Sequence, residues 1–417
     1  MKPDLTALSP ASWCFSPEWL PQPAYLVGGA VRDALLGRKS EYLDLDFVLP
    51  ENAVKTACAI AHHYKAGFVL LDAKRQIARV VFKHLTLDFA QQEGSTLEAD
   101  LGRRDYTINA IAYNPHTQEV IDPLQGYLDL QNGLVRMISP TNLQDDPLRL
   151  LRAYRQAAQL NFTIEPHTQS VIRSFAPLLA QVAAERVRVE LGYLLGSEAG
   201  NHWLQAACVD GLLTSCFPSA TLTQLDKLTS VDCAAATLTQ TYPQLGVALS
   251  QAVRDTVKTT WLAIAKLATL VNPDPEIAEL ELINLTYSRA EIKGVTCALR
   301  LLPQLQTVPP ERMSLAEQYF FFRTTGVVFP VVAVLAVAAG VSTDAISPLI
   351  HRYLTPDDPI AHPTPLITGK DLMQALKLPS SPVVGELLLQ IQLAQIEGKI
   401  LTVEEAIAFA SQLLDNQ

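Results

Sequence analysis

Hydrophobic and polar residues alternate most regularly in residues 43–49, which read LDLDFVL. Because successive side chains of a strand point to opposite faces, this alternation predicts a β-strand with its apolar residues on the core side. The opposite side carries Asp44 and Asp46, and Pro50 ends the strand.

Shorter apolar runs, separated by glycine and polar residues, predict the other elements of the N-terminal part. They indicate strands at 24–28, 68–71, 76–83 and 86–89, helices at 30–36 and 51–65, and a helix or strand–helix junction at 105–113. These elements predict an α+β head with a small mixed sheet.

Helical periodicity dominates the rest of the chain. It predicts a clear helix at 145–160, two more within 166–195, and further helices to about residue 350. Four prolines in 354–365 indicate a linker before a compact helical end piece. We therefore expect a head (1–138), followed by an all-α neck with the base-reading helix (139–200), body (201–355) and tail (356–417).

Composition narrows the classes of protein. The chain is 49% hydrophobic and has a net charge of −10, which excludes a uniformly basic nucleic-acid-binding surface. A local basic patch remains, because residues 149–190 hold six arginines and no lysine. The six scattered cysteines favour reduced thiols over a disulfide framework or zinc site, and with no signal peptide they predict a cytoplasmic protein. The most apolar stretch, 326–341, predicts a buried helix rather than a membrane span.

The strand with two aspartates is a candidate metal site. Asp44 and Asp46 share one face with Cα atoms roughly 6.5–7 Å apart, and two carboxylates so close repel unless a cation lies between them. Oxygen ligands favour Mg²⁺. A similar pattern in TLDF places Asp88 as a third carboxylate if the two strands are neighbours, which suits a two-metal mechanism. The alternative is that Asp44 and Asp46 are solvent-facing residues of an edge strand.

A glycine pair supplies a candidate phosphate cradle. Gly28 and Gly29 allow backbone N–H groups to approach phosphate oxygens at the start of a helix. Arg32 lies one turn further and can reach a triphosphate, whereas we expect Asp33 to cap or pair locally. The sequence matches neither the GxxxxGK[ST] loop nor the dinucleotide fingerprint.

Later arginine-rich motifs connect these features. In order, the chain carries LVGGAVRD, LDLDF, RRDYTINA, DPLQGYLDL, DDPLRLLRAYR and ERVRVE. It strongly resembles class II tRNA nucleotidyltransferases and the related bacterial poly(A) polymerases. The resemblance is dense over 24–195 and returns in the last fifty residues or so, while about 200–350 matches only in being helical.

The resemblance implies a polymerase-β-like nucleotidyltransferase head, Mg²⁺ as the cofactor, and catalysis by Asp44, Asp46 and Asp88. It also implies that Asp146 and Arg149, three apart on one helix face, read the incoming base. The remaining nucleotide-binding residues that it implies are Gly28, Gly29, Arg32, Arg104, Asp105, Asn109, Arg152 and Arg155. Glu185, Arg186 and Glu190 are expected to brace the reading helix. Asp145 stands where family members usually have Glu.

Only fourteen residues separate Asp88 from Arg103. Family members that add all of CCA usually have a longer flexible loop there, so the resemblance implies a CC-adding enzyme acting on the tRNA 3′ end. Its partners would be CTP, tRNA through the acceptor stem and elbow, and no membrane. The alternatives are a full CCA-adding enzyme that also uses ATP, a poly(A) polymerase, and an inactive RNA-binding or nucleotide-sensing protein. The sequence does not fix the oligomeric state.

Overall fold

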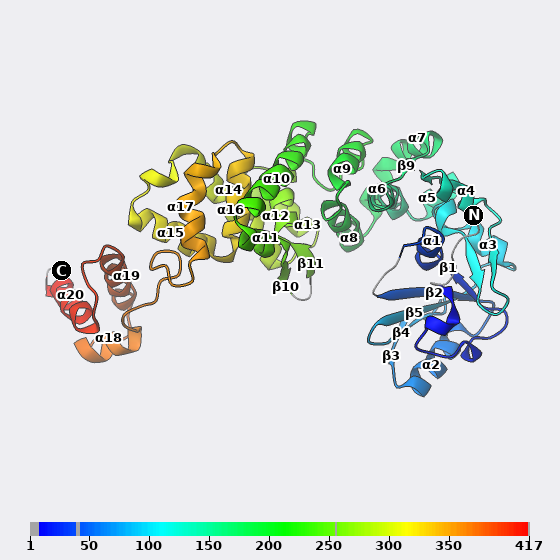
Figure 1. Ribbon diagram of the computed structural model, residues 1–417, viewed down its shortest axis with the longest axis horizontal. Coiled ribbons are helices and arrows are strands. Elements are labelled where there is room, and N and C mark those ends of the chain that lie inside the picture. The colour runs from blue at the N-terminus through cyan, green and yellow to red at the C-terminus, as the bar shows by residue number, and fades with distance from the viewer. Residues whose placement is uncertain (1–7, 39–41, 255–256, 416–417) are drawn as a thin grey trace. The chain divides into compact units, whose positions relative to one another are not determined.

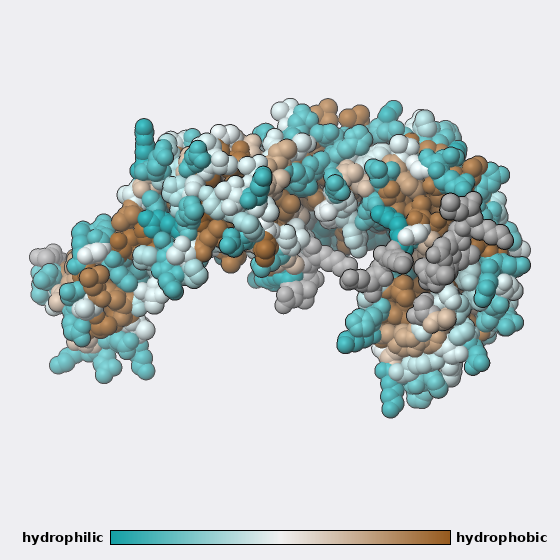
Figure 2. Space-filling view, in the orientation of Figure 1, coloured by the Kyte–Doolittle hydropathy of each residue, from teal (hydrophilic) through white to brown (hydrophobic). Residues whose placement is uncertain are grey.

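The structure is a computed structural model that describes residues 8–38, 42–254 and 257–415. It divides into two compact units, Met1–Ser215 and Cys216–Gln417 (Figure 1). Each unit has its own core and is described by itself. On the face drawn in Figure 2, hydrophobic and hydrophilic residues are interspersed on both units.

A seven-stranded mixed sheet forms the centre of the first unit. Its order is β3-β4-β5-β2-β1-β6-β7. The strands are β1 (Tyr25–Val27), β2 (Leu43–Leu49), β3 (Gly67–Asp72), β4 (Ile77–Val81), β5 (Leu85–Gln91), β6 (Ala112–Asn114) and β7 (Glu119–Ile121). Strands β2 and β5 run parallel, whereas the other neighbouring pairs run antiparallel. The predicted mixed sheet is confirmed, and the predicted strand at 43–49 has the bounds of β2.

Helix α2 (Ala53–Tyr64) packs on β3, β4 and β5, and α1 (Gly29–Leu35) packs on β1 and β2. The core-facing side of β2 and β5 brings Phe47 and Phe89 together as stacked rings 5.3 Å apart. This packing holds β2 against β5 with its carboxylates on the other face, as the alternation predicts.

Short elements and helices complete the first unit. They are η2 (Pro10–Ser12), η3 (Pro17–Trp19), α3 (Leu97–Gly102), η4 (Thr107–Asn109), α4 (Gly126–Gln131), β8 (Leu134–Val135), α5 (Pro140–Asp145), α6 (Leu148–Leu160), β9 (Thr163–Ile164), α7 (Pro166–Phe175), η5 (Ala176–Gln181), α8 (Ala184–Leu195) and α9 (Gly200–Val209). The two helices expected within 166–195 are α7 and α8. Residues 105–113 hold a 3₁₀ turn and the start of β6 rather than a helix.

The helix predicted at 145–160 is wrong at its start. It is two helices, because Pro147 disfavours a helical conformation of the residue before it. Asp146 accordingly adopts an extended conformation, with φ −137° and ψ 90°, between α5 and α6. Helix α6 begins only at Leu148. Its apolar face is buried and packs on α8 and α9.

The second unit is helical apart from a hairpin, β10 (Ala252–Arg254) and β11 (Val257–Thr260), that the sequence patterns did not indicate. Its first part contains α10 (Leu222–Thr241), α11 (Pro243–Ser250), α12 (Trp261–Leu270), α13 (Pro275–Asn284), α14 (Arg289–Thr307), η6 (Pro310–Arg312), α15 (Leu315–Thr325), η7 (Gly326–Val328), α16 (Phe329–Ala338) and α17 (Thr343–Leu354). Three helices then follow the proline-rich linker: α18 (Gly369–Leu376), α19 (Pro382–Ile396) and α20 (Val403–Asp415), which share a core.

The apolar stretch expected to be a buried helix is α16. It packs against α10, α12 and α14, and the side chains of 329–336 are buried. Residues Leu315–Ala338 are long and apolar enough to cross a membrane by length and composition, but 67% of their most apolar window is buried within the protein. The prediction of a core helix is therefore confirmed for this stretch.

Candidate active site

Two carboxylates lie on one face of β2, as predicted. Asp44 is exposed and Asp46 is half-buried, while Leu45 between them is buried in the core. Burial, together with the negative charges of Asp88 and Asp44, raises the pKa of Asp46 to about 6 against the opposing effect of Arg104 and Arg79. A bound cation would offset the repulsion between neighbouring carboxylates and favour their ionised form. Asp44 and Asp46 therefore suit a divalent metal ion as oxygen ligands.

Asp88 lies next to this pair, because β5 and β2 pair in register and the Cα partner of Asp46 is Asp88. Its carboxylate is held by Arg79 on β4, whose Nε and Nη2 each donate a hydrogen bond of 2.7 Å. The hydrogen bond to Asp88 also raises the pKa of the Arg79 guanidinium. Among the described residues no group of three or more His, Cys, Asp or Glu is placed to hold a metal ion. The structure thus places two carboxylates on β2 beside a third carboxylate, on β5, that is paired with Arg79.

The glycine pair joins β1 to α1 beside the carboxylates. Gly28 has φ +73°, a conformation that side-chain-bearing residues rarely adopt, and a Cβ there would lie 3.1 Å from Oδ2 of Asp46. The backbone can therefore approach the metal-site carboxylate only with glycine at this position. Arg32 donates to the Asn109 side chain at 2.9 Å and pairs with Asp33 at 2.9 Å, which confirms the local pairing expected of Asp33.

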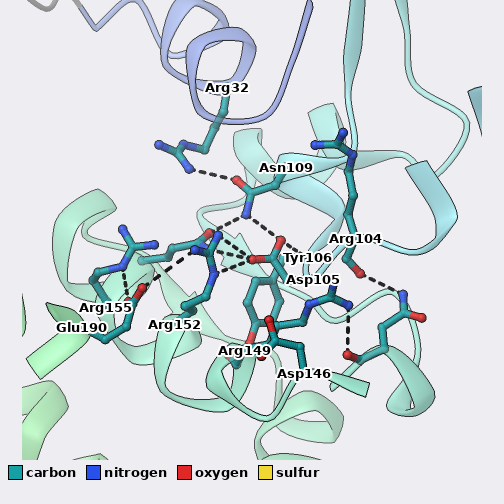
Figure 3. Close-up of polar contacts among 12 residues, drawn as sticks. Arg32, Arg104, Asp105, Tyr106, Asn109, Asp146, Arg149, Arg152, Arg155 and Glu190 are labelled. Atoms are coloured by element: carbon teal, nitrogen blue, oxygen red, sulfur yellow. Dashed lines mark hydrogen bonds and ion pairs between the residues drawn. The ribbon is translucent and has the colours of Figure 1, made fainter. Parts of the chain in front are cut away.

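A pocket of about 500 Å³ brings most of the predicted residues together. It is lined by Gly28, Gly29, Arg32, Asp44, Asp46, Arg104, Asp105, Asn109, Asp146, Arg149, Arg152, Arg155 and Arg186. Twelve of these thirteen were predicted to bind nucleotide or metal, and the thirteenth, Arg186, was predicted to have a bracing role. Asp88 is the predicted site residue that does not line the pocket. The lining thus combines the β2 carboxylates with a group of arginines, and Figure 3 shows how Arg32, Arg104, Arg149, Arg152 and Arg155 lie around Asp105 and Asn109.

Asp105 is a buried carboxylate that binds two of the residues lining the pocket, Arg152 and Asn109. Burial alone would raise its pKa, but Arg152, Asn109 and the Tyr106 N–H stabilise the carboxylate and lower the pKa to about 2. Arg152 donates to it through Nε at 3.0 Å and pairs through Nη2 at 2.9 Å (Figure 3). Asn109 donates to it at 2.9 Å. Asp105 is therefore a buried anion that orients Arg152 and Asn109.

Glu190 on α8 performs the bracing that the sequence suggested. It is buried, accepts a close hydrogen bond from Arg155 and lies 3.8 Å from Arg152 (Figure 3). Arg155 also contacts the ring of Tyr193, 5.6 Å from its centroid. These contacts fix two arginines of α6 toward the pocket.

Asp146 and Arg149, the two predicted base-reading residues, lie close together, but not because they share a helix face. They do not share a helix face, because Asp146 precedes α6 in an extended conformation. The Arg149 N–H donates to the Asp146 carbonyl at 3.0 Å, which keeps both residues in one tight turn. Arg186 on α8 pairs with Oδ2 of Asp146 at 2.8 Å. The break in the helix therefore presents both side chains to one pocket.

Sequence reasoning missed two residues of this region. Arg79 neutralises Asp88, and Asn142 on α5 holds the backbone of residues 102 and 104. Arg79 lies on an alternating strand, where a cation opposite a predicted carboxylate was a usable signal. Asn142 gave no such signal, since its role depends on carbonyl groups that the fold brings to it.

Three known family descriptions match successive parts of the chain. The description "Poly A polymerase head domain" matches residues 24–136. "Probable RNA and SrmB- binding site of polymerase A" matches 161–222, and "tRNA nucleotidyltransferase domain 2 putative" matches 255–410. The family descriptions thus span the sheet, the helices after it and the second unit.

Curated relatives match almost the whole chain. A protein of Synechocystis sp. named "CC-adding tRNA nucleotidyltransferase" is 50% identical over 396 residues, 94% of this chain and 94% of its own length. A protein of Geobacter sulfurreducens with the same name is 32% identical over 92% of this chain and 90% of its own. Among solved structures, a CCA-adding enzyme in complex with CTP aligns with a TM-score of 0.73 and 25% identity, covering 95% of this chain and 93% of that one.

Proposed function

Because the chain belongs to the tRNA nucleotidyltransferase family, we propose that it transfers two cytidine nucleotides, one at a time, from CTP to the 3′ end of tRNA and releases pyrophosphate. The observation that carries this proposal is the single pocket that joins Asp44 and Asp46 to Asp146 and Arg149. Such a pocket can hold the reacting phosphate and select the base together. The place of action is the cytoplasm.

The triphosphate binds between the glycine pair and the arginines that line the pocket. Gly28 and Gly29 offer backbone N–H groups without a Cβ in the way. Arg32, Arg152 and Arg155 line the same pocket and supply charge-assisted hydrogen bonds to phosphate oxygens. The nucleotide therefore sits with its phosphates over β1 and β2.

Asp44 and Asp46 hold the divalent cation, for which we propose Mg²⁺ because the available ligands are hard carboxylate oxygens. When bound there, Mg²⁺ lowers the pKa of the attacking 3′-hydroxyl and neutralises charge on the triphosphate. Asp88 lies beside Asp46 on β5 and is the third carboxylate of the proposed site, behind the two that line the pocket. Arg79 holds that carboxylate in place through hydrogen bonds to both of its oxygens.

Base selection follows from donor and acceptor patterns. Asp146 accepts from the cytosine amino group, and Arg149 donates to the adjacent ring nitrogen. Arg186 pairs with Oδ2 of Asp146, and within the described residues Oδ1 has no protein donor, so it is left to accept. Uracil presents a carbonyl and a ring N–H instead, so both contacts are mismatched. Unpaired buried groups cost about 1–3 kcal/mol each, which gives about one to two orders of magnitude of discrimination per mismatched contact.

The restriction to two C additions rests on the connection between β5 and α3. This connection is short, and its Glu93 is tied to α3 twice: its N–H donates to Asp100 at 2.9 Å, and its carboxylate pairs with Arg103. We propose that a connection this short does not reshape the base pocket for adenine. Addition therefore stops before A.

The test uses tRNA transcripts ending at position 73, with CTP, ATP and Mg²⁺, analysed at single-nucleotide resolution. We expect two C additions and no A addition with both nucleotides present. If this protein does not extend the tRNA while a positive-control enzyme extends the same tRNA, the nucleotidyltransferase activity is refuted. Efficient addition of A after the second C would select full CCA addition, which the likeness to a CCA-adding structure keeps as the second candidate.

A further inference from the structure

Asn142 lies at the junction between the nucleotide pocket and the end of α3, and the proposed function gives it no role. The residue is buried, with 8% of its surface exposed. The amide Nδ2 donates to the carbonyl of Gly102 and to the carbonyl of Arg104, both at 2.8 Å. One amide group thus uses both of its donors to hold a single strip of backbone, residues 102–104.

Arg149 is held by the same two segments. Its Nη1 donates to the backbone carbonyl of Asn142 at 2.9 Å and to that of Arg103 at 2.8 Å. Arg103 lies between the two residues whose carbonyls Asn142 binds. Asn142 therefore contributes one acceptor to Arg149 directly and fixes the position of the other.

Two fixed acceptors on one nitrogen set the plane of the guanidinium, because its five N–H donors have a rigid planar arrangement. No further hydrogen bond from this guanidinium to another described residue is formed, and Arg149 lines the pocket. Its remaining donors are thereby aimed by the backbone and stay available to a base. A guanidinium aimed in one direction distinguishes the ring nitrogen of cytosine from the N–H of uracil.

We propose that Asn142 is a positioning residue for base selection, which sets the direction of Arg149 and through it the preference for cytosine over uracil. The inference rests on the proposed function, since it assigns the residue behind the proposed base reader. Without the Asn142 amide, two carbonyls lose their donors and the 102–104 strip is free to shift. The acceptor for Arg149 on Arg103 then shifts with it.

The test compares CTP with UTP incorporation into tRNA by the full-length protein. We expect Asn142→Ala to lower the ratio of kcat/KM for CTP over UTP about tenfold while the KM for tRNA stays unchanged. The matched control is Asn132→Ala. Asn132 is an exposed asparagine after α4 that does not contact Arg149 or residues 102–104, so the ratio should stay at the wild-type value. An unchanged ratio in Asn142→Ala overturns the proposal.

A double-mutant cycle separates positioning from general support of the fold. In an Arg149→Ala background, Asn142→Ala should lower the CTP-over-UTP ratio no further, because its effect passes through Arg149. An equal loss in both backgrounds would show that Asn142 acts on selectivity by another route. Asn142→Ser, which keeps one donor, should give an intermediate ratio.

Thermal unfolding of each variant accompanies the kinetics. If neither Asn142→Ala nor Asn142→Ser folds, the residue is a structural support and the positioning role is wrong. The wild-type arm tests the proposed function separately: a wild type that adds no C to tRNA refutes that function. If the wild type adds C and Asn142→Ala has the same CTP-over-UTP ratio, only this inference is refuted.

Discussion

The pairing of Asp88 with Arg79 shows how one neighbour changes what a carboxylate can do. The sequence places three aspartates on two adjacent strands, and the register between β2 and β5 brings Asp46 and Asp88 side by side. The bidentate contact with Arg79 then satisfies both oxygens of Asp88. Asp44 and Asp46 lie on the same face of β2 and line the pocket, which Asp88 does not.

Asp46→Asn should therefore abolish nucleotide transfer. The substitution removes a metal ligand worth several kcal/mol of transition-state stabilisation, so we expect a loss of roughly a thousandfold or more. Single-turnover CTP incorporation measures it, while the fluorescence anisotropy of labelled tRNA should show unchanged affinity. Glu119→Gln on the edge strand β7 is the matched control for loss of one negative charge. Residual activity above a few per cent of wild type would contradict the ligand role.

Asp105 makes a prediction for pH dependence. Its pKa of about 2 lies below the ordinary value of 3.8, so its ionised form stabilises the folded state above pH 4. That contribution, roughly 2 kcal/mol for such a shift, is lost as the pH falls from about 4 through 2. Asp105→Asn should thus be less stable than wild type at pH 7, and the gap should narrow between pH 4 and pH 3. Urea unfolding at each pH measures it, and a gap independent of pH would contradict the assignment.

At the scale of elements, two glycines in the first unit have opposite surroundings. A Cβ on Gly126, which begins α4, would lie 2.2 Å from the carbonyl oxygen of Thr107, and that backbone cannot yield cheaply. A Cβ on Gly192 within α8 would meet nothing within 4 Å. Close packing of α4 on η4 thus requires glycine, whereas the middle of α8 does not.

Gly126→Ala should destabilise the first unit by about 3 kcal/mol or more, since overpacking here meets backbone. Gly192→Ala should stabilise it by about 0.5–1 kcal/mol, because alanine is the better helix former. Chemical denaturation of both variants beside wild type measures the two signs. Equal effects of the two substitutions would show that the close approach of α4 to Thr107 is misassigned.

The elements also show where sequence reasoning succeeds and fails. Strand β2 and helices α1 and α2 were predictable within a residue or two, because alternation and glycine or proline breaks are local signals. The break before α6 was missed because apolar periodicity runs across it, although Pro147 carried the physical reason. Most of the pocket was predictable from motif order. The hydrogen bonds from the Asn142 amide were not predictable, because their acceptors are carbonyl groups 38 and 40 residues away in sequence.

At the scale of the whole molecule, two units with separate cores should unfold in separate steps. All the pocket residues belong to the first unit, Met1–Ser215. CTP with Mg²⁺ at a hundred times its Kd should stabilise this unit by about 2.7 kcal/mol and leave the other step in place.

Differential scanning calorimetry with and without CTP measures the effect. The unfolding step whose midpoint temperature falls in Gly126→Ala is the one that belongs to the first unit. UTP at the same concentration should shift that step less. A CTP-dependent shift confined to the other step would contradict the placement of the nucleotide.

The carbonyl groups that hold Arg149 have a consequence for inheritance. Most specificity determinants are side chains, and a single nucleotide change in the gene can delete them. The acceptors at 103 and 142 are main-chain atoms, which every amino acid retains. Substitution of the Arg103 side chain therefore leaves its acceptor in place. For the proposed reading of the base by Arg149, two of the contacts that hold the guanidinium are therefore kept when these side chains are substituted.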